Sequence, residues 1–366
     1  MQPYLTEVYG NPSSVHASGR RARHAVEESR DRVAAVLKVD PSEIVFTSGG
    51  TESDNAALFS TLEPTAHPRL VTGAVEHEAV LSAAAHLKRA GVSVTVLPPD
   101  EAGSARLDLL EGALKEGPAL VSLMHVNNET GALNPVAEIS MIVHEAGGLV
   151  HSDAVQSSVC YALSEIVAAV DLLSLSAHKI GGPKGAGLLF ARAGAPVGRV
   201  LHGGSQERKR RAGTENVAAI VGFASALEWV QAEPAETAGS IREKRDRLVA
   251  GLRGRLGEGV RVTTPDDPDR SAPHIVHAVF PDGRGGGLDG EMLILGLDLE
   301  GVQVSSGAAC SSGAMEPSHV VEALGIEPAL GRSAIRFSLG SNTTFEDIAY
   351  TLDCVEKVVA RTFRHR

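Results

Sequence analysis

The sequence predicts an α/β protein whose larger part is built on a mostly parallel, seven-stranded sheet. From about residue 40 to residue 192, short apolar segments alternate with helical patterns, which is typical of parallel strands joined by crossover helices. Several segments are apolar throughout, as expected for strands that helices cover on both faces. We expect strands at Ile44–Thr47, Leu70–Gly73, Val92–Leu97, Leu120–Val126, Leu149–His151, Leu172–Ser176 and Gly187–Ala191.

A change of composition divides the chain into two domains. An apolar, helix-like stretch ends near Trp229, and a polar segment then precedes the strongly charged helix expected at Ile241–Leu256. We therefore expect a large domain over residues 13–235. A smaller α+β domain is expected over residues 236–366, together with residues 1–12, and its strands are predicted near Ile275–Phe280, Val302–Ser305 and Ala334–Ser338.

Helices at the two ends of the chain follow from periodicity and capping. After Gly19, apolar residues recur at close to the 3.6-residue helical period, at Ala22, Val26, Val33, Val36 and Leu37. The last helix opens at Thr343–Glu346, which has the spacing of a capping box, and buries Ile348, Leu352, Val355 and Val359.

Composition excludes several classes of function. The 366 residues carry a formal net charge of −11, which disfavours a stable nucleic-acid partner. No apolar run approaches the ~18 residues that span a bilayer. Three scattered cysteines are too few for a disulfide framework or a zinc site. We expect a protein of the reducing cytoplasm, with no membrane and no metal.

The segment after the sixth expected strand contains the most informative chemistry. Ser176, His178 and Lys179 follow that strand and precede the glycine-rich turn at residues 181–187. A lysine placed at a strand end suggests a carbonyl cofactor held as a Schiff base, which indicates pyridoxal phosphate. A surface lysine in an ordinary loop is the alternative for this segment taken alone.

Polar residues also follow the other expected strands. In an open parallel sheet these strand ends meet in one crevice, so residues distant in sequence can share a site. The turn before Gly50 suits a phosphate at a helix start, although such turns also occur without a ligand. His77 could stack on a cofactor and act catalytically as a general acid or base, or it could simply cap a helix. Asn128 could bind a ligand or stabilise a turn. Asp153 could pair with a protonated pyridine nitrogen.

Cys310 stands in a run of small residues, Ser305–Met315. A structural cysteine normally packs among large apolar neighbours, as we expect of Cys354. A thiol on a flexible loop instead suits a nucleophile that accepts a group and passes it on. An incidental cysteine in a glycine-serine loop is the alternative.

Five motifs together resemble the cysteine desulfurases, which belong to the class V aminotransferases of fold type I, a group of pyridoxal 5'-phosphate (PLP) enzymes. The resemblance runs from about Tyr9 to the C-terminus. The motifs are Gly10-Asn11-Pro12-Ser13-Ser14, Thr47-Ser48-Gly49-Gly50-Thr51-Glu52-Ser53, Asn127-Asn128-Glu129-Thr130-Gly131, Ser176-Ala177-His178-Lys179 and Ser305-Ser306-Gly307-Ala308-Ala309-Cys310. The resemblance implies a fold-type I PLP-transferase with the large and small domains described above.

The resemblance also implies roles for single residues. Lys179 would form the Schiff base, His77 would stack over the ring and Asp153 would pair with the ring nitrogen. Gln156 and Asn128 would approach the phenolic oxygen. The phosphate would be held by Gly50, Thr51, Ser176 and His178, and by Thr214 from the neighbouring subunit of a homodimer. Asn11, Asn128 and Arg336 would bind the substrate, Arg336 through its carboxylate.

The implied reaction converts L-cysteine to L-alanine and leaves the sulfur on Cys310 as a persulfide, for delivery to a scaffold or carrier protein of iron-sulfur cluster or thiolation pathways. The family normally has an upstream strand that this sequence does not contain, and we expect that difference to bear on activity. A selenocysteine lyase, another class V aminotransferase and a non-catalytic sulfur-assembly partner are the alternatives. The basic loop at residues 203–211 is either a solvated surface or a contact for an acidic carrier protein or RNA.

Overall fold

The computed structural model describes residues 1–62, 68–199, 201–306 and 316–364, which form two compact units. Unit 1 comprises Met1–Leu97, Leu107–His125 and Asn134–Pro234, and unit 2 comprises Pro98–Arg106, Val126–Leu133 and Ala235–Arg366. The N-terminal residues belong to unit 1, whereas we expected residues 1–12 in the smaller domain. The reason is that α1 (Gln2–Thr6) packs against α8 (Val217–Val230), a helix of unit 1.

Unit 1 contains the expected seven-stranded sheet, in the order β1-β7-β6-β5-β4-β2-β3. Only β7 runs antiparallel to its neighbours, so the prediction of a mostly parallel sheet is confirmed. The strands are β1 (Ile44–Thr47), β2 (Arg69–Gly73), β3 (Ser93–Leu97), β4 (Leu120–Ser122), β5 (Leu149–Asp153), β6 (Leu172–Ser176) and β7 (Gly187–Ala191).

Two strand ends differ from the prediction. β4 ends at Ser122, before the expected end at Val126. β5 continues past His151 to Asp153, because Asp153 is in register with Ser174 of β6. This extension places Asp153 within the sheet rather than in the loop after it.

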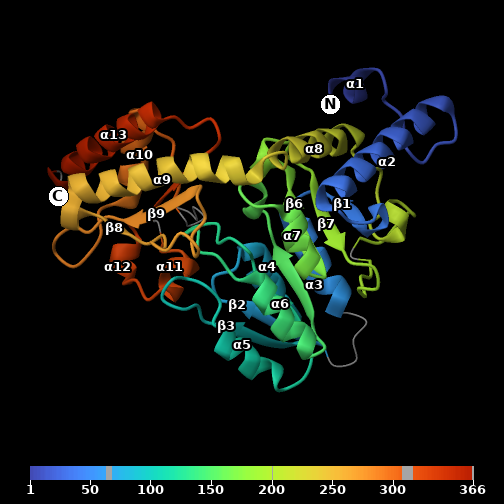
Figure 1. The fold of residues 1–366 in the computed structure, drawn as a ribbon, viewed down its shortest axis with the longest axis horizontal. Helices are drawn as coiled ribbons and strands as arrows, with labels where there is room; N and C mark the ends of the chain where they lie inside the picture. Colours follow the sequence, from blue (N-terminus) through green and yellow to red (C-terminus); the bar gives the residue numbers. More distant parts are fainter. Residues whose placement is uncertain (63–67, 200, 307–315, 365–366) are drawn as a thin grey trace. The chain divides into compact units, whose positions relative to one another are not determined.

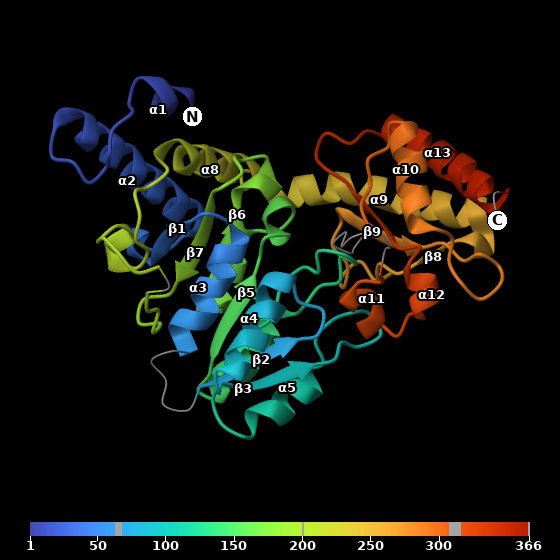
Figure 2. The same ribbon diagram turned by 180° about the vertical axis from the view of Figure 1, so that it is seen from behind.

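Helices cover both faces of the sheet. Figures 1 and 2 show α3 (Gly50–Leu62) and α4 (Glu78–Arg89) on one face, and α6 (Val136–Glu145) and α7 (Leu163–Ala169) on the other. The long helix α2 (Ala17–Leu37) packs against α8. The short helix α5 (Leu107–Leu114) and the 3-10 turns η1 (Pro41–Glu43), η2 (Ser157–Val159), η3 (Ala177–Ile180) and η4 (Glu207–Lys209) complete this unit.

Unit 2 is an α+β unit built on a small antiparallel sheet in the order β10-β9-β8. Its strands are β8 (Arg261–Val262), β9 (Ile275–Val279) and β10 (Ile335–Ser338). The strand expected at Val302–Ser305 is reduced to an isolated bridge between Ser305 and Arg336. The helices are α9 (Pro234–Leu256), α10 (Gly290–Leu299), α11 (His319–Ala323), α12 (Pro328–Gly331) and α13 (Phe345–Arg364), and η5 (Gly257–Gly259) precedes β8.

The apolar core of unit 1 lies between α3, α4 and the sheet, where buried side chains such as Leu58, Leu70 and Leu172 pack together. None of the helices within the described residues is long and apolar enough to cross a membrane.

Candidate active site

The first turn of α3 forms one wall of the site. β1 ends at Thr47, and α3 begins three residues later at Gly50. A Cβ atom at Gly187 would lie 2.5 Å from Cα of Gly49, so this turn approaches β7 too closely for any other residue at position 187. A Cβ atom at Gly50 would lie 3.6 Å from Cβ of Ser176. The helix start, with its free N–H groups, therefore adjoins the end of β6 and suits a phosphate.

The segment after β6 carries the hydroxyl, imidazole and amine that the sequence placed there. Ser176 is buried, and its Oγ lies 2.9 Å from Nδ1 of His178. Burial, followed by the charges of Lys179 and Lys184, lowers the pKa of His178. The turn η3 ends at Gly181, whose φ of 76° is in the left-handed region. His178 and Lys179 are both exposed, one after the other in this turn.

The charges of His77 and Lys179 act on the carboxyl group of Asp153. Asp153 is only 8 % exposed, and its Oδ1 accepts a hydrogen bond of 2.9 Å from the N–H of Val155. Burial raises the pKa of Asp153, whereas the Val155 N–H and the charges of His77 and Lys179 act to lower it. A cationic ring nitrogen placed against this carboxylate would stabilise its charged form further.

His77 caps a helix, which was the alternative to a role in stacking on a cofactor. It is the N-cap residue of α4, and its Nδ1 accepts a hydrogen bond of 3.1 Å from the N–H of Ala79. Its side chain is nevertheless exposed, close enough to Asp153 to act on it. Capping fixes the ring orientation, so the two interpretations are compatible.

Gln156, the last of the residues predicted after β5, is the N-cap residue of η2, three residues beyond Asp153, and is half-buried.

In unit 2, Nη1 of Arg336 donates a hydrogen bond of 2.6 Å to the carbonyl oxygen of Asn128. Burial lowers the pKa of Arg336, while the nearby Glu129 opposes this shift. Nε of Arg336 is buried and has no hydrogen-bond partner among the described residues. It is available to a carboxylate.

Asn11 and Thr214 line one cavity of unit 1, of about 340 Å³, together with apolar residues such as Tyr4 and Leu5. Thr214 is exposed, and the Oδ1 of Asn11 accepts a hydrogen bond from the N–H of Ser13. Cys310 lies outside the described residues. The other two cysteines, Cys160 and Cys354, are both buried.

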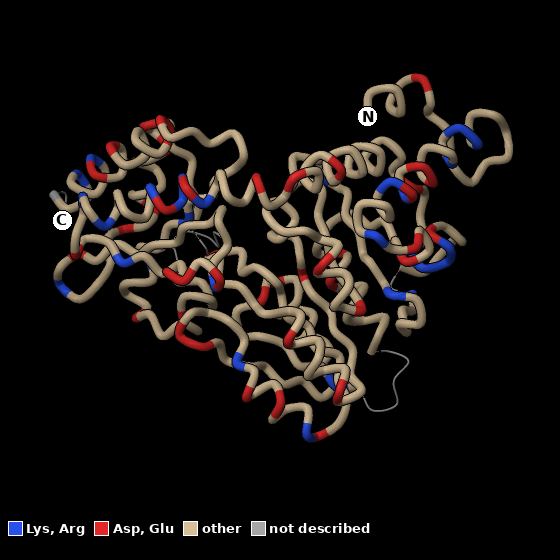
Figure 3. Tube along the Cα trace, in the orientation of Figure 1, with Lys and Arg blue, Asp and Glu red and all other residues tan. Residues whose placement is uncertain are grey.

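The basic loop at residues 203–211 is largely neutralised by acidic partners of unit 1. Nη2 of Arg30 lies 2.8 Å from Glu207, and both side chains are about 2 % exposed. Arg211 pairs with Glu52 at 2.8 Å, at the first turn of α3, and Arg208 lies 3.5 Å from Glu27. Figure 3 shows basic and acidic residues interspersed in the N-terminal part of unit 1.

The same loop is conformationally strained. Glu207, Arg208 and Lys209 have φ values of 44°, 55° and 71°, a left-handed conformation that costs roughly 1 kcal/mol or more at each residue that is not glycine. The buried pair of Glu207 with Arg30 holds it in place.

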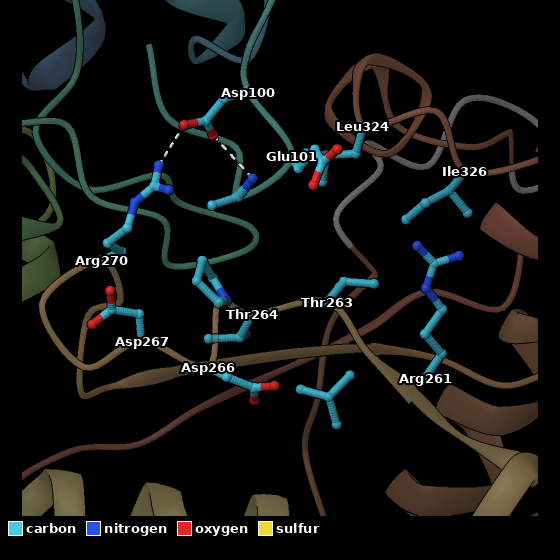
Figure 4. A pocket seen from close by; sticks show the side chains of 13 residues that line it. Asp100, Glu101, Arg261, Thr263, Thr264, Asp266, Asp267, Arg270, Leu324 and Ile326 are labelled. Atoms are coloured by element: carbon cyan, nitrogen blue, oxygen red, sulfur yellow. Dashed lines mark hydrogen bonds and ion pairs between the residues drawn. The ribbon is translucent and has the colours of Figure 1, made fainter. Parts of the chain in front are cut away.

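A groove of about 620 Å³ in unit 2 is lined mainly by polar and charged residues (Figure 4). Arg270 pairs with Asp100 at 2.5 Å, and Arg261 points away from this pair. Within the described residues there is no cluster of three or more histidine, cysteine or acidic side chains that could hold a metal ion. We assign no ligand to the groove.

Sequence reasoning missed a set of buried titratable residues close to Asp153. Asp54 on α3, Glu76 after β2 and His151 on β5 are each at most 1 % exposed. A signal was available for His151, which follows Leu149 and Val150 in an apolar strand. Asp54 and Glu76 stand among other polar residues, so the sequence offered no such signal for them.

Comparison with known proteins places the chain in a family. Residues 1–350 match the class-V aminotransferases. The chain belongs to the class-V aminotransferase family. The resemblance that the five motifs indicated is thereby confirmed, together with the expected fold type.

Within the class-V aminotransferases, the chain is similar to proteins named cysteine desulfurase. It is 41 % identical to the cysteine desulfurase IscS of Dictyoglomus turgidum, over 99 % of this chain and 90 % of the relative. It is also 41 % identical to a cysteine desulfurase of a Nostoc species, over 99 % and 88 %. A solved structure of a NifS-like protein superposes with a TM-score of 0.89 at 36 % identity, covering 98 % of this chain and 94 % of the other. A structure of SspA in complex with cysteine has a TM-score of 0.79 at 27 % identity, covering 94 % of each chain.

Proposed function

We propose that this protein is a PLP-dependent cysteine desulfurase that converts L-cysteine to L-alanine and retains the sulfur on Cys310. The observation that carries the proposal is the buried carboxylate of Asp153 beside the charges of His77 and Lys179. Its relatives named cysteine desulfurase, at about 41 % identity over nearly the whole chain, support the choice of reaction.

The residues of unit 1 fit PLP by the chemistry of their donors. An amine for the Schiff base (Lys179) and a buried carboxylate for the pyridinium nitrogen (Asp153) interact with each other. The start of α3 at Gly50 and Thr51 lies beside Ser176, which is hydrogen-bonded to His178, so N–H and side-chain donors for a phosphate are grouped. We assign Gln156 and Asn128 to the phenolic oxygen.

Arg336 is our candidate for binding the substrate carboxylate, with Asn11 and Asn128 beside the substrate. One guanidinium nitrogen is already fixed by the carbonyl of Asn128, which orients the side chain. The unpartnered Nε leaves an edge of the guanidinium for a carboxylate. Because Arg336 is half-buried, this interaction would be little screened by water.

The chain's own groups perform the chemistry around the cofactor, which when bound withdraws the electrons released at the substrate Cα. Nζ of Lys179 takes the proton from that carbon. The thiolate of Cys310 then attacks the substrate sulfur. The Cβ–S bond breaks, its electron pair goes to Cβ, and this carbon takes up a proton. Alanine leaves, and the persulfide on Cys310 waits for an acceptor protein.

Two further parts of the proposal concern assembly and location. We propose a homodimer in which Thr214 of one subunit contacts the phosphate bound by the other, because the Thr214 side chain is exposed beside a cavity with exposed apolar neighbours, Leu5 and Tyr9. We also propose a cytoplasmic location and a scaffold or carrier protein as the sulfur acceptor.

The test is alanine production from L-cysteine by the purified protein loaded with PLP. We expect a yellow cofactor absorbance in the wild type and in C310A, but alanine and persulfide formation only in the wild type. The matched control is C160A, which removes a buried thiol and should remain active. Alanine production by C310A at the wild-type rate would contradict the role of Cys310, and no cofactor absorbance in the wild type would contradict the enzyme class.

A further inference from the structure

Four buried polar side chains form a chain across the interface between α3 and the sheet of unit 1. Nδ1 of His151 (β5) lies 2.9 Å from Oγ of Ser122 (β4), and its Nε2 lies 3.0 Å from Oγ of Ser174 (β6). Asp54 (α3) also interacts with Ser174, and its Oδ1 is 3.6 Å from Nε2 of His151. All four residues are at most 1 % exposed.

The apolar surroundings of these four side chains do not favour polar groups. The same interface is otherwise the apolar core of α3, α4 and the sheet, with Ala57, Leu58 and Leu172 fully buried. Hydrogen-bonded polar groups buried there contribute little net stability, and a packed apolar set of similar volume would be about as stable. A polar chain in this position therefore indicates a role besides stability.

The position of the chain points to Asp153. His151 and Asp153 are two residues apart on β5, so their side chains share one face of the sheet. Ser174 is directly opposite Asp153 on β6. Asp54 belongs to the first turns of α3, the helix that begins at Gly50 beside Ser176. The chain thus connects the strands that hold Asp153 to the helix whose start we assign to the phosphate.

The charges around Asp54 favour an uncharged carboxyl group. The titratable groups that face it are Asp153 and His151 on β5 and Glu76 after β2, of which the two acids repel a second negative charge. Burial, followed by the charges of these two acids, raises the pKa of Asp54, although its hydrogen bond with Ser174 acts to lower it. Burial lowers the pKa of His151 to about 3. The described cationic groups His77 and Lys179 act on Asp153 instead.

We propose that Asp54 is a positioning residue for Asp153, an uncharged carboxylic acid that donates a proton to Ser174 while Ser174 donates to His151. In this arrangement Asp54, Ser174 and His151 each donate one hydrogen bond along the chain, the last from Nδ1–H of His151 to Ser122. Asp153 then remains ionised, while the four members of the buried polar chain beside it carry no charge. The inference rests on the proposed function for its consequence, a carboxylate that faces the cofactor.

The charge state can be tested without cofactor, in the apoprotein. We expect infrared spectra to show the carbonyl stretch of a protonated carboxyl group that D54N lacks and that D31N, an exposed control on α2, retains. An unchanged carbonyl band in D54N would overturn the proposal. Because Asn keeps the shape and a donor, this variant should fold.

The pH dependence of stability gives an independent readout. A carboxyl group that stays protonated when folded binds a proton that the unfolded chain releases, so its presence destabilises the fold increasingly as the pH rises above about 4. We expect the unfolding equilibrium constant of the wild type, divided by that of D54N, to increase up to about tenfold per pH unit between roughly pH 5 and 7. A ratio that does not change with pH would mean that Asp54 is ionised in the fold.

The positioning role is tested in the loaded protein. D54N should bind PLP with a dissociation constant within about threefold of the wild type, whereas D54A, which removes the donor to Ser174, should weaken binding about tenfold or more. The pH at which the cofactor absorbance changes should also shift in D54A and not in D54N. Equal binding and equal pH profiles in D54A and the wild type would overturn this role. A wild type that binds no PLP would refute the proposed function and leave the apoprotein tests intact.

Discussion

The two units differ in the ionisable groups that lie around their proposed sites. Unit 1 buries the carboxyl groups of Asp54, Glu76 and Asp153 in one region, and burial raises the pKa of each. Unit 2 half-buries the guanidinium of Arg336, near the histidines His274 and His277, whose pKa values burial and Arg336 lower to about 4. A region rich in carboxyls suits a cationic ring, and a desolvated guanidinium suits a carboxylate. We infer from this difference that the carboxyl groups of unit 1 suit the cofactor ring, whereas the guanidinium of unit 2 suits the substrate carboxylate.

The largest effect should come from Lys179, which sharpens the assignment for unit 1. We expect K179A to lower kcat at least about 10³-fold, because the general base and the Schiff-base amine are lost together. The measurement is alanine production with excess PLP. K184A, five residues along in the same turn region, is the control and should keep near-normal turnover; comparable loss in both variants would argue for general damage to the turn.

The pair of Arg30 and Glu207 tests whether unit 1 can bury a cation without its acidic partner. Removing the Glu207 carboxylate leaves a buried guanidinium and releases the strained loop, so E207A should lower the free energy of unfolding by about 3–5 kcal/mol. Chemical denaturation measures this change. E300A removes the acid partner of Lys357 and Arg361 at the surface of unit 2 and should cost much less. Similar losses of stability in E207A and E300A would mean that the buried ion pair contributes no more than the exposed ones.

Arg336 tests the assignment for unit 2. Loss of its charge-assisted hydrogen bonds should raise KM for L-cysteine by roughly 30–100-fold in R336A, equivalent to about 2–3 kcal/mol. The cofactor absorbance should not change, since Lys179 and Asp153, which we assign to the Schiff base and the ring nitrogen, lie in unit 1. R336K keeps the charge without the planar fork and should fall between the two. A KM in R336A equal to that of the wild type would exclude Arg336 from substrate binding.

The smallest effect concerns acid sensitivity in unit 2. His277 is fully buried, with its Nδ1 2.5 Å from Oγ1 of Thr263. A pKa lowered to about 4 means that the folded state binds fewer protons than the unfolded state between about pH 6.5 and 4, so stability falls as the pH falls through this window. H277N should remove one proton from this dependence, about 1.4 kcal/mol per pH unit, in unfolding curves at several pH values.

The control for this last prediction is H24N, an exposed histidine of α2. It should leave the pH dependence unchanged. A wild-type slope retained in H277N would mean that the ring is charged beside Arg336, against the contrast between the two units.

Much of the fold could be predicted because its signals are local. Strands such as Leu188–Phe190 are apolar throughout, and α2 and α13 carry regular helical periods. The two-residue strand β8 and the loss of the strand at Val302–Ser305 could not be predicted, since such short elements depend on which neighbour offers backbone hydrogen bonds. The same applies to residues 1–12, whose unit is decided by the contact of α1 with α8.

For the site, the sequence by itself determined which residue types stand at the strand ends, and with them the motifs that identify the family. The order of Ser176, His178 and Lys179, and the position of Asp153 two residues after His151, are properties of the sequence alone. Only the tertiary structure decided how their charges interact, because a pKa depends on burial and on neighbours distant in sequence. The tertiary structure brought the charges of His77 and Lys179 close to Asp153. It also placed Asp54 and His151 in one buried polar chain, whereas hydrophobic periodicity in the sequence can predict only that a position is buried.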